Sequence, residues 1–368
     1  MKRCQFERID LLVVLFLLGS LTSQSFADTQ AFYSVDDYAS VPKIDAHMHV
    51  HTDTTDFVSL ALRDDFRFVN MAVWADDAAT NREKHRTMYV QFKAFPDRIA
   101  PVCSFPLENF DDDDFSDQTI KYLNGQIAKG AVGVKVWKNI GMELRDANGK
   151  LVMIDHPKFD PVFKHIAAKK LVLLGHLGEP KNCWLPLKEM TTNNDRMYFS
   201  ENPKYHMHLQ PKMPSYEDQI AARDAMLAKN PDINFFACHM ASLEWSTQRM
   251  TEFLERFPNA TLDVAARMGQ IQYQSQRDRK NMVDFITKYQ NRILYGSDTG
   301  VGPETNVAGK YEYAKARWLR DWEYFVTDHM VQVPELDDPV QGLRLPKSIV
   351  DKLYRINAMR VFAGSFKK

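Results

Sequence analysis

The chain has 368 residues, with 47 basic and 48 acidic side chains and a formal net charge of −1. It has no basic stripe or run, so nucleic acid is not expected as a partner. The length suits a single barrel domain of about 250 residues with loop insertions, and no apolar stretch reaches the roughly 20 residues of a membrane-spanning helix.

The first 27 residues are expected to be a secretory signal peptide. A basic start precedes the apolar run 11–18, and small residues follow at 25–27, which predicts cleavage after Ala27. A single uncleaved membrane anchor is the alternative. Residues 28–368 would then form one exported domain, periplasmic or otherwise extracytoplasmic, with no membrane contact after cleavage.

Apolar, β-rich runs alternate with helical patterns along the rest of the chain, which predicts a parallel sheet covered by helices. The expected strands are 43–47, 68–74, 99–104, 132–137, 171–175, 233–238, 261–266 and 292–297. The expected helices are 80–95, 117–130, 159–170, 216–229, 245–257, 276–290 and 311–327. Eight such units close into an α/β TIM (β/α)8 barrel. An open doubly wound sheet is the alternative, and the chain lacks the GxGxxG motif that would favour it.

Three connections are long enough to form a pocket over one end of this barrel. Residues 138–158 contain the turn sequence Asp146-Ala147-Asn148-Gly149 and are expected to form a small hairpin. Residues 177–215 are expected to lack regular structure, which is typical of functional or mobile loops. Residues 301–345 hold the helix 311–327, and a final helix is expected at 346–362.

Five of the apolar runs end in a metal-binding or charged side chain. They read Asp45-Ala46-His47-Met48-His49, Gly133-Val134-Lys135-Val136-Trp137, Leu174-Gly175-His176, Ala237-Cys238-His239 and Tyr295-Gly296-Ser297-Asp298. A barrel of parallel strands brings all its strand ends to one rim, where one metal site would satisfy these residues.

Each of these side chains has a simpler explanation when it is taken alone. His47 and His49 lie on the same side of an extended strand and suit zinc, but they could be polar strand-end residues. His176 and His239 could be hydrogen-bonded core histidines, and Asp298 could cap a helix. Their matched positions after apolar strands favour ligand roles for the set.

This order of residues resembles the amidohydrolase superfamily, most closely its amidohydrolase-related (family 2) branch, from about residue 43 to residue 364. The resemblance implies that His47, His49, His176 and Asp298 bind a divalent metal, with zinc favoured, and that Asp298 also takes the proton of the attacking water. The same resemblance leaves His239 and Lys135 with two roles each.

His239 would be either a ligand of a second metal or a group that polarises the substrate. Lys135 would be either carbamylated and bridging two metals, or catalytic without binding metal. One tightly held metal is favoured, and a second stays open.

Other residues follow the strands at positions where a substrate would bind. Glu179 lies just after His176, and Arg267 follows the seventh strand, where it could clamp a substrate carboxylate or form a surface ion pair. Trp137 could form a wall of the pocket or belong to the core. Lys138 could pair with substrate.

Three cysteines remain after residue 27, so a full set of disulfides is not expected. Cys103 and Cys238 are predicted to be small core residues. His206 and His208 form a second HxH pair, but in a loop, where a lid or plain surface is expected.

The sequence therefore predicts a metal-dependent hydrolase, in which a metal-activated water attacks an amide, lactone or ester carbonyl of a small molecule. A metal-dependent decarboxylase or hydratase of a small carboxylic acid is the alternative on the same barrel. A barrel that binds a ligand without catalysis is the third hypothesis. The expected partner is a small-molecule substrate, and a homo-oligomer stays open.

Overall fold

The computed structural model describes residue 1 and residues 32–367. The signal peptide expected at residues 1–27 lies outside this described range. Within residues 32–367, no helix combines the length and the apolar character needed to cross a bilayer.

One parallel sheet forms the centre of the fold. Its strands are β1 (Lys43–Val50), β2 (Phe66–Met71), β3 (Ile99–Cys103), β4 (Gly133–Val136), β5 (Val172–Gly175), β6 (Asn234–Ala237), β7 (Ala260–Asp263), β8 (Ile293–Leu294) and β9 (Thr299–Val301). They lie side by side in the order β8-β7-β6-β5-β4-β3-β2-β1-β9. Every expected strand is thus present, with ends that differ by a few residues.

Residues 293–301 connect the two edges of this sheet. β8 pairs with β7, and β9 pairs with β1. Between these two pieces, Ala46 N–H donates to Tyr295 O (2.9 Å) and Asp298 N–H donates to His47 O (2.9 Å). β8 and β9 therefore act as one eighth strand in two pieces, and the predicted α/β barrel is confirmed.

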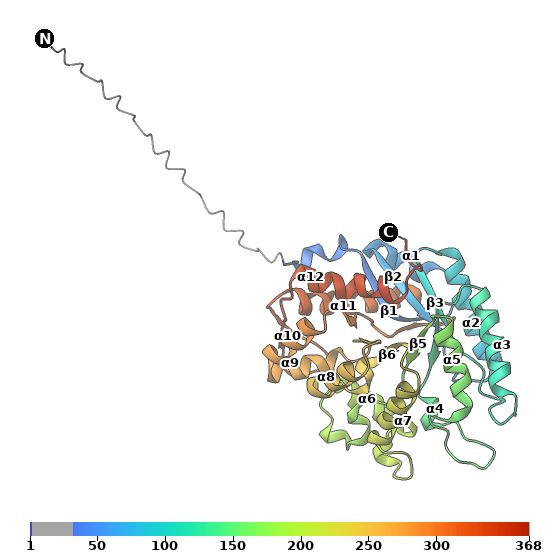
Figure 1. Ribbon diagram of the computed structural model, residues 1–368. Helices are drawn as coiled ribbons and strands as arrows, with labels where there is room; N and C mark the ends of the chain where they lie inside the picture. The colour runs from blue at the N-terminus through green and yellow to red at the C-terminus, as the bar shows by residue number, and fades with distance from the viewer. Residues whose placement is uncertain (2–31, 368) are drawn as a thin grey trace. The chain divides into compact units, whose positions relative to one another are not determined.

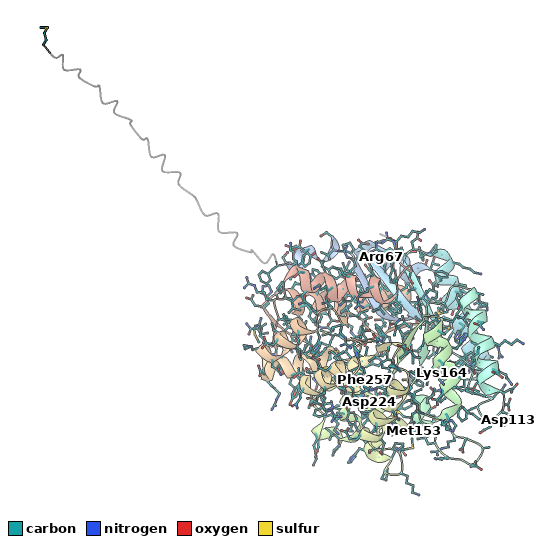
Figure 2. All side chains as sticks on the ribbon, in the orientation of Figure 1. Arg67, Asp113, Met153, Lys164, Asp224 and Phe257 are labelled. Carbon is teal, nitrogen blue, oxygen red and sulfur yellow. The ribbon has the colours of Figure 1, made fainter. Side chains whose placement is uncertain are left out.

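Helices surround the strands (Figure 1). They are α1 (Asp56–Ala61), α2 (Ala78–Ala94), α3 (Phe115–Ala128), α4 (Asn139–Met142), α5 (Asp160–Ala168), α6 (Asn193–Glu201), α7 (Tyr216–Lys229), α8 (Thr247–Arg256), α9 (Met268–Arg277), α10 (Arg279–Lys288), α11 (Val307–Val326), α12 (Lys347–Asp351) and α13 (Asn357–Val361). In the view of Figure 1, α2, α3 and α5 line the right-hand side and α8, α9 and α10 the left. Charged side chains such as Asp113 and Lys164 project outward from this ring (Figure 2).

Local sequence explains where the clearest helix begins and ends. The hydroxyl of Ser215 accepts a hydrogen bond from Asp218 N–H, and the Asp218 carboxylate accepts one from Ser215 N–H. This capping box fixes the start of α7. The helix stops at Asn230 because Pro231 cannot continue it. The helix predicted over 216–229 is therefore confirmed to the residue.

Two apolar layers hold the barrel together. The inner one contains alternate strand residues, such as Ile44, Ala46, Val69 and Met71, together with Phe362 near the C-terminus. The outer one packs the opposite strand faces against the helices. Because the C-terminal segment contacts the starts of β5 and β6, it covers the end of the barrel opposite the carboxyl ends of the strands.

An irregularity in β1 turns its two histidines toward the barrel axis. Ile44 and Ala46 face the inner layer, whereas Met48 and Val50 face the outer one. The register of β1 on β2 shifts between Asp45 and Met48, and a bulge of this kind reverses which side chains face inward. Strict alternation from Ile44 would have directed His47 and His49 outward.

The long connections and one helix differ in detail from the predictions. Residues 138–158 form the expected small hairpin, with a single antiparallel bridge between Arg145 and Leu151 across the turn, and the unpredicted α4 precedes it. Residues 177–215, expected to lack regular structure, contain α6 and several short 3-10 turns. The helix predicted at 276–290 is present as α10, and α9, which precedes it and ends at Arg277, was not predicted. A small strand pair, β10 (Met330–Val331) and β11 (Val340–Gln341), lies within 301–345.

Candidate active site

All nine side chains predicted for the site line one cavity of about 400 Å³. They are His47, His49, Lys135, Trp137, His176, Glu179, His239, Arg267 and Asp298. Each lies at or just beyond the carboxyl end of a strand, which is the rim where active sites of such barrels form. The fold therefore brings the whole predicted set together, while the role of each residue stays a prediction.

His47 and His49 present unprotonated ring nitrogens to Asp298. His47 Nδ1 donates to Asp263 Oδ2 (2.6 Å), and His49 Nδ1 donates to the carbonyl oxygen of Met71 (2.9 Å). In a neutral imidazole the other nitrogen then has only a lone pair. The two Nε2 atoms lie 3.4 and 3.3 Å from Asp298 Oδ1. Three electron-pair donors therefore converge with no proton among them.

This donor set fits a divalent cation. The ligand atoms of His47, His49 and Asp298 all lie within 4.8 Å of one another. Burial and the nearby Lys135 lower the pKa of His47, which favours the neutral, coordinating ring. Two imidazoles and a carboxylate, with each imidazole oriented by a second partner, are typical of metal sites.

His176 lies beside this group and not within it. His239 Nδ1 donates to the carbonyl oxygen of Ala265 (2.8 Å), so His239 Nε2 accepts from His176 Nδ1 (3.1 Å). His176 Nε2 lies 3.3 Å from Glu179 Oε2. Burial first, and the neighbouring cations second, hold the pKa of His176 well below its usual value. As a metal ligand, His176 stays a prediction from the resemblance.

Lys135, on β4, extends toward the His47 ring. Its Nζ lies 3.3 Å from His47 Nε2 and 2.9 Å from Cys238 Sγ. Cys238 was predicted to be a small core residue, and it is fully buried, but its sulfur also contacts this lysine. Burial raises the pKa of the Cys238 thiol to about 12, so the thiol stays protonated.

Two buried aspartates that the sequence analysis did not single out, Asp45 and Asp263, support the histidines. Asp263 accepts hydrogen bonds from His47 Nδ1 and from the backbone N–H of His239 (2.5 Å). Asp45 accepts from the backbone N–H groups of His47 and Ser297 (3.1 and 2.9 Å). A signal was available, because each is an ionisable residue inside an otherwise apolar strand, where it needs a partner.

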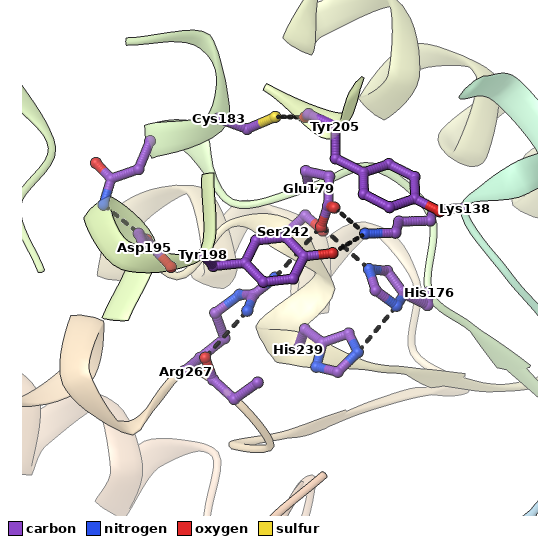
Figure 3. Close-up of polar contacts among 12 residues, drawn as sticks. Lys138, His176, Glu179, Cys183, Asp195, Tyr198, Tyr205, His239, Ser242 and Arg267 are labelled. Carbon is purple, nitrogen blue, oxygen red and sulfur yellow. Dashed lines mark hydrogen bonds and ion pairs between the residues drawn. The ribbon is translucent and has the colours of Figure 1, made fainter. Parts of the chain in front are cut away.

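Glu179 occupies the centre of a second charged cluster (Figure 3). It forms a short ion pair with Lys138, which also bonds to the Tyr198 hydroxyl (3.1 Å). The Lys138 ammonium lies over the rings of Trp137, Tyr198 and Tyr205, between 4.0 and 5.3 Å from their centroids. Burial lowers the pKa of Lys138, but Glu179 raises it by more. Lys138 pairs with Glu179 and also lines the cavity, so a contact with substrate stays a prediction.

Arg267 is surrounded by carboxylates. It is only 5% exposed, and its guanidinium lies 4.0 Å from Glu179 and 3.8 Å from Glu244. It is therefore not the surface ion pair considered from the sequence. Burial raises the pKa of Glu244 to about 7, with Arg267 acting in the opposite direction. Glu244 was not singled out by the sequence, because it lies in a loop seven residues after β6.

Trp137 lines the cavity, as one of its two interpretations required. The loop pair His206 and His208 does not line it: His206 is buried and bonds to the carbonyl oxygen of Leu185 (2.8 Å). The expectation of a lid or plain surface was wrong for His206, because this ring fills the small apolar cluster under residues 177–215.

The backbone is strained where β6 and β8 end. His239, Met240, Ala241 and Ser242 have φ values of 60°, 54°, 59° and 54°, and Asp298 has 61°. Residues other than glycine rarely adopt this left-handed region, and such outliers gather at functional sites. These turns aim the side chains of His239 and Asp298 into the cavity.

A family model described as amidohydrolase matches residues 44–364. The chain belongs to the amidohydrolase family. The resemblance predicted from the strand ends is therefore confirmed. Members of this family typically use a divalent metal, in keeping with the candidate ligand group His47, His49 and Asp298.

Solved structures share the barrel of this chain at low sequence identity. A protein described as amidohydrolase II is 15% identical with a TM-score of 0.51, and covers 87% of this chain and 99% of its own. A 2,6-dihydroxybenzoate decarboxylase from Rhizobium is 13% identical with a TM-score of 0.51, at 87% and 98%. No curated protein matches. Identities this low support the fold alone.

Proposed function

We propose that this amidohydrolase-family protein is a metal-dependent hydrolase that cleaves an amide, lactone or ester bond of a small molecule. The observation that carries the proposal is the convergence of two bare imidazole nitrogens and one carboxylate, those of His47, His49 and Asp298, at the wall of a cavity. A divalent cation held there would supply Lewis acidity and make water more acidic.

Asp298 is the proposed proton carrier. An aspartic acid of ordinary acidity is ionised at neutral pH, so this carboxylate is free to take up a proton. It would accept a proton from the attacking water and return it to the leaving group. Its position between His47 and His49 keeps it within reach of that water.

Lys135 and His239 differ in hydrogen-bonding capacity, and this difference supports different roles for them. The Lys135 amino group lies beside His47 and can donate to a carbonyl oxygen. His239 carries its proton on Nδ1, bound to Ala265 O, so its Nε2 is an acceptor. This tautomer supports an orienting role for His239, through His176 or a substrate hydroxyl, better than polarisation of a carbonyl, which needs a donor.

We further propose that the metal is zinc, held once per chain, because zinc favours imidazole and carboxylate ligands. Elemental analysis of the isolated protein tests this directly. In a two-metal site, Lys135→Ala would lower the metal content per chain. In a one-metal site it would leave the content unchanged and lower turnover only.

A decarboxylase is the second candidate, supported by the barrel shared with 2,6-dihydroxybenzoate decarboxylase. The lysine and arginine side chains in the cavity could neutralise a substrate carboxylate. A screen of lactones, esters, amides and aromatic acids with the zinc-loaded protein separates the two. We expect ring-opened or cleaved acids without carbon dioxide, and carbon dioxide release would favour the decarboxylase.

Export is proposed on the basis of residues 1–27 alone. N-terminal sequencing of the protein recovered from the expressing cell would then begin at Asp28. A protein that retains Met1 and fractionates with membranes would support the uncleaved anchor instead. The oligomeric state in solution can be measured on the same sample.

A further inference from the structure

Two arginines line the cavity, and their surroundings differ. Arg267 lies within 4.0 Å of Glu179 and Glu244, so two carboxylates offset its charge. Arg317, on α11, lines the same cavity near Asp298. Within residues 32–367, Arg317 forms neither a hydrogen bond nor an ion pair. A guanidinium in a cavity without a partner is a strong donor for an anion.

The carboxylates nearest to Arg317 are engaged elsewhere. Asp321, one turn further along α11, accepts a hydrogen bond from the Tyr295 hydroxyl (2.9 Å) and is almost fully buried. Glu335 also lines the cavity, but its Oε1 lies 4.0 Å from Arg320. These two carboxylates therefore favour the charged form of Arg317, but neither occupies its N–H groups.

The rim around Arg317 is apolar and aromatic. Tyr313 lies four residues before Arg317, on the same face of α11, and it is 63% exposed. Met197 and Tyr198, on α6, also line the cavity, and they are 60% and 37% exposed. Exposed large apolar side chains around a cavity mark a binding site for an apolar body. The cavity thus combines an apolar mouth with a guanidinium that pairs with no carboxylate of residues 32–367.

We propose that Arg317 is a specificity-determining residue that binds an anionic group of the substrate, a carboxylate on an apolar or aromatic body. This inference rests on the proposed function for its substrate and deepens it. The carboxylate would lie against Arg317, at a point separate from the His47–His49–Asp298 group, and the apolar body would lie between α6 and α11. The bond to be cleaved would then face Asp298.

Equilibrium binding of benzoate to the zinc-loaded protein tests this role, with benzamide as the neutral probe. Loss of a charge-assisted hydrogen bond should weaken benzoate binding of Arg317→Gln by about tenfold or more. Arg317→Lys should lose less benzoate affinity, because lysine keeps the positive charge but not the planar pair of donors. Benzamide binding should change little in either variant. The matched control is Arg277→Gln, which removes an exposed arginine outside the cavity.

A second measurement uses the unmodified protein and does not depend on the folding of any variant. Phenylglyoxal labels accessible arginines, and mass mapping reports each site separately. Benzoate should slow the labelling of Arg317 at least fivefold and leave that of Arg277 unchanged. Unaltered labelling of Arg317, wild-type benzoate affinity in Arg317→Gln, or no saturable benzoate binding by the wild type would each overturn the inference.

The outcome is separable from the test of the proposed function. Benzoate binding that depends on Arg317, in a protein that cleaves no ester, lactone or amide, would keep the anion site and remove the hydrolase. Turnover of esters, together with benzoate binding that does not depend on Arg317, would keep the hydrolase and remove the anion site.

Discussion

The two sides of the cavity solve opposite electrostatic problems. On one side, His47, His49 and Asp298 bring three electron-pair donors together without a proton or an internal cation bound to all of them. On the other side, Lys138 and Arg267 share the carboxylate of Glu179, and Glu244 adds a second.

From this difference we infer that the first side is a binding site and that the second side, the scaffold side, has a structural role. Converging lone pairs repel one another, so the first side is stabilised by a ligand that enters from outside. The second side is balanced internally, and its buried charges fix the positions of loops that follow four different strands. Changes on the first side should therefore affect function, and changes on the second should affect stability first.

The largest expected effect is on the first side, formed by His47, His49 and Asp298. Asp298→Asn or His47→Ala should lower turnover by about a thousandfold or more, because each removes a ligand and the first also removes the proton carrier. The far-ultraviolet circular dichroism spectrum should stay that of the wild type. Metal content and kcat/KM measured on the same preparation check both points. Wild-type turnover in either variant would remove the proposed mechanism.

Breaking the scaffold side should destabilise the protein. Glu179→Gln leaves Lys138 and Arg267 buried with less compensation, which should cost about 3 kcal/mol of unfolding free energy. The double variant Lys138→Met with Glu179→Gln should lose less than the two single variants added together. Urea unfolding of the three variants measures this coupling.

The matched control is Asp284→Asn, which breaks the exposed pair with Lys280 and should hardly change the unfolding free energy. A Glu179→Gln protein as stable as this control would mean that the second cluster is not a scaffold.

The smallest effect is a pH dependence on the scaffold side. The folded protein holds the proton of Glu244 up to a pKa of about 7, whereas the usual value is 4.5. A raised folded-state pKa means that this group stabilises the protein fully below pH 4.5, and that this contribution is lost as the pH rises to 7. The loss amounts to at most about 3 kcal/mol.

Glu244→Gln should flatten this part of the stability profile, since glutamine cannot release a proton. Urea unfolding at several pH values between 4.5 and 7.5 compares the variant with the wild type. The difference between the two curves isolates Glu244, because the buried carboxyls of Asp45 and Asp321, with pKa values also raised to about 6, are common to both. Parallel curves would contradict the shift.

Much of the fold and the candidate metal ligands could be predicted from the sequence, because their signals are local. Each strand is a short apolar run, and each predicted ligand comes directly after one. Parallel strands in a barrel place such positions on one rim regardless of what the loops do. The nine predicted residues therefore needed no knowledge of loop structure to be grouped.

The remaining part depends on contacts between segments that are distant in the chain. Arg317 and Glu244 lie on a helix and in a loop, where charged residues are usually exposed. Only the packing of those segments buries Glu244 and places Arg317 in the cavity. The bulge in β1 depends on its pairing with β2, so alternation along the strand could not reveal it. Cys238 was read as a core thiol because its neighbours are apolar, and its contact with Lys135 comes from another strand.

The four left-handed residues that follow β6 have a further consequence. Glycine would adopt these φ values with less strain, by about 1 kcal/mol for each position, yet none of the four is glycine. A side chain at each position narrows the range of backbone angles open to the loop, and so fixes the direction of His239. Because glycine would relieve this strain, selection for heat resistance alone should favour glycine at position 240 or 241. The resulting variants should have a higher melting temperature and a lower turnover rate.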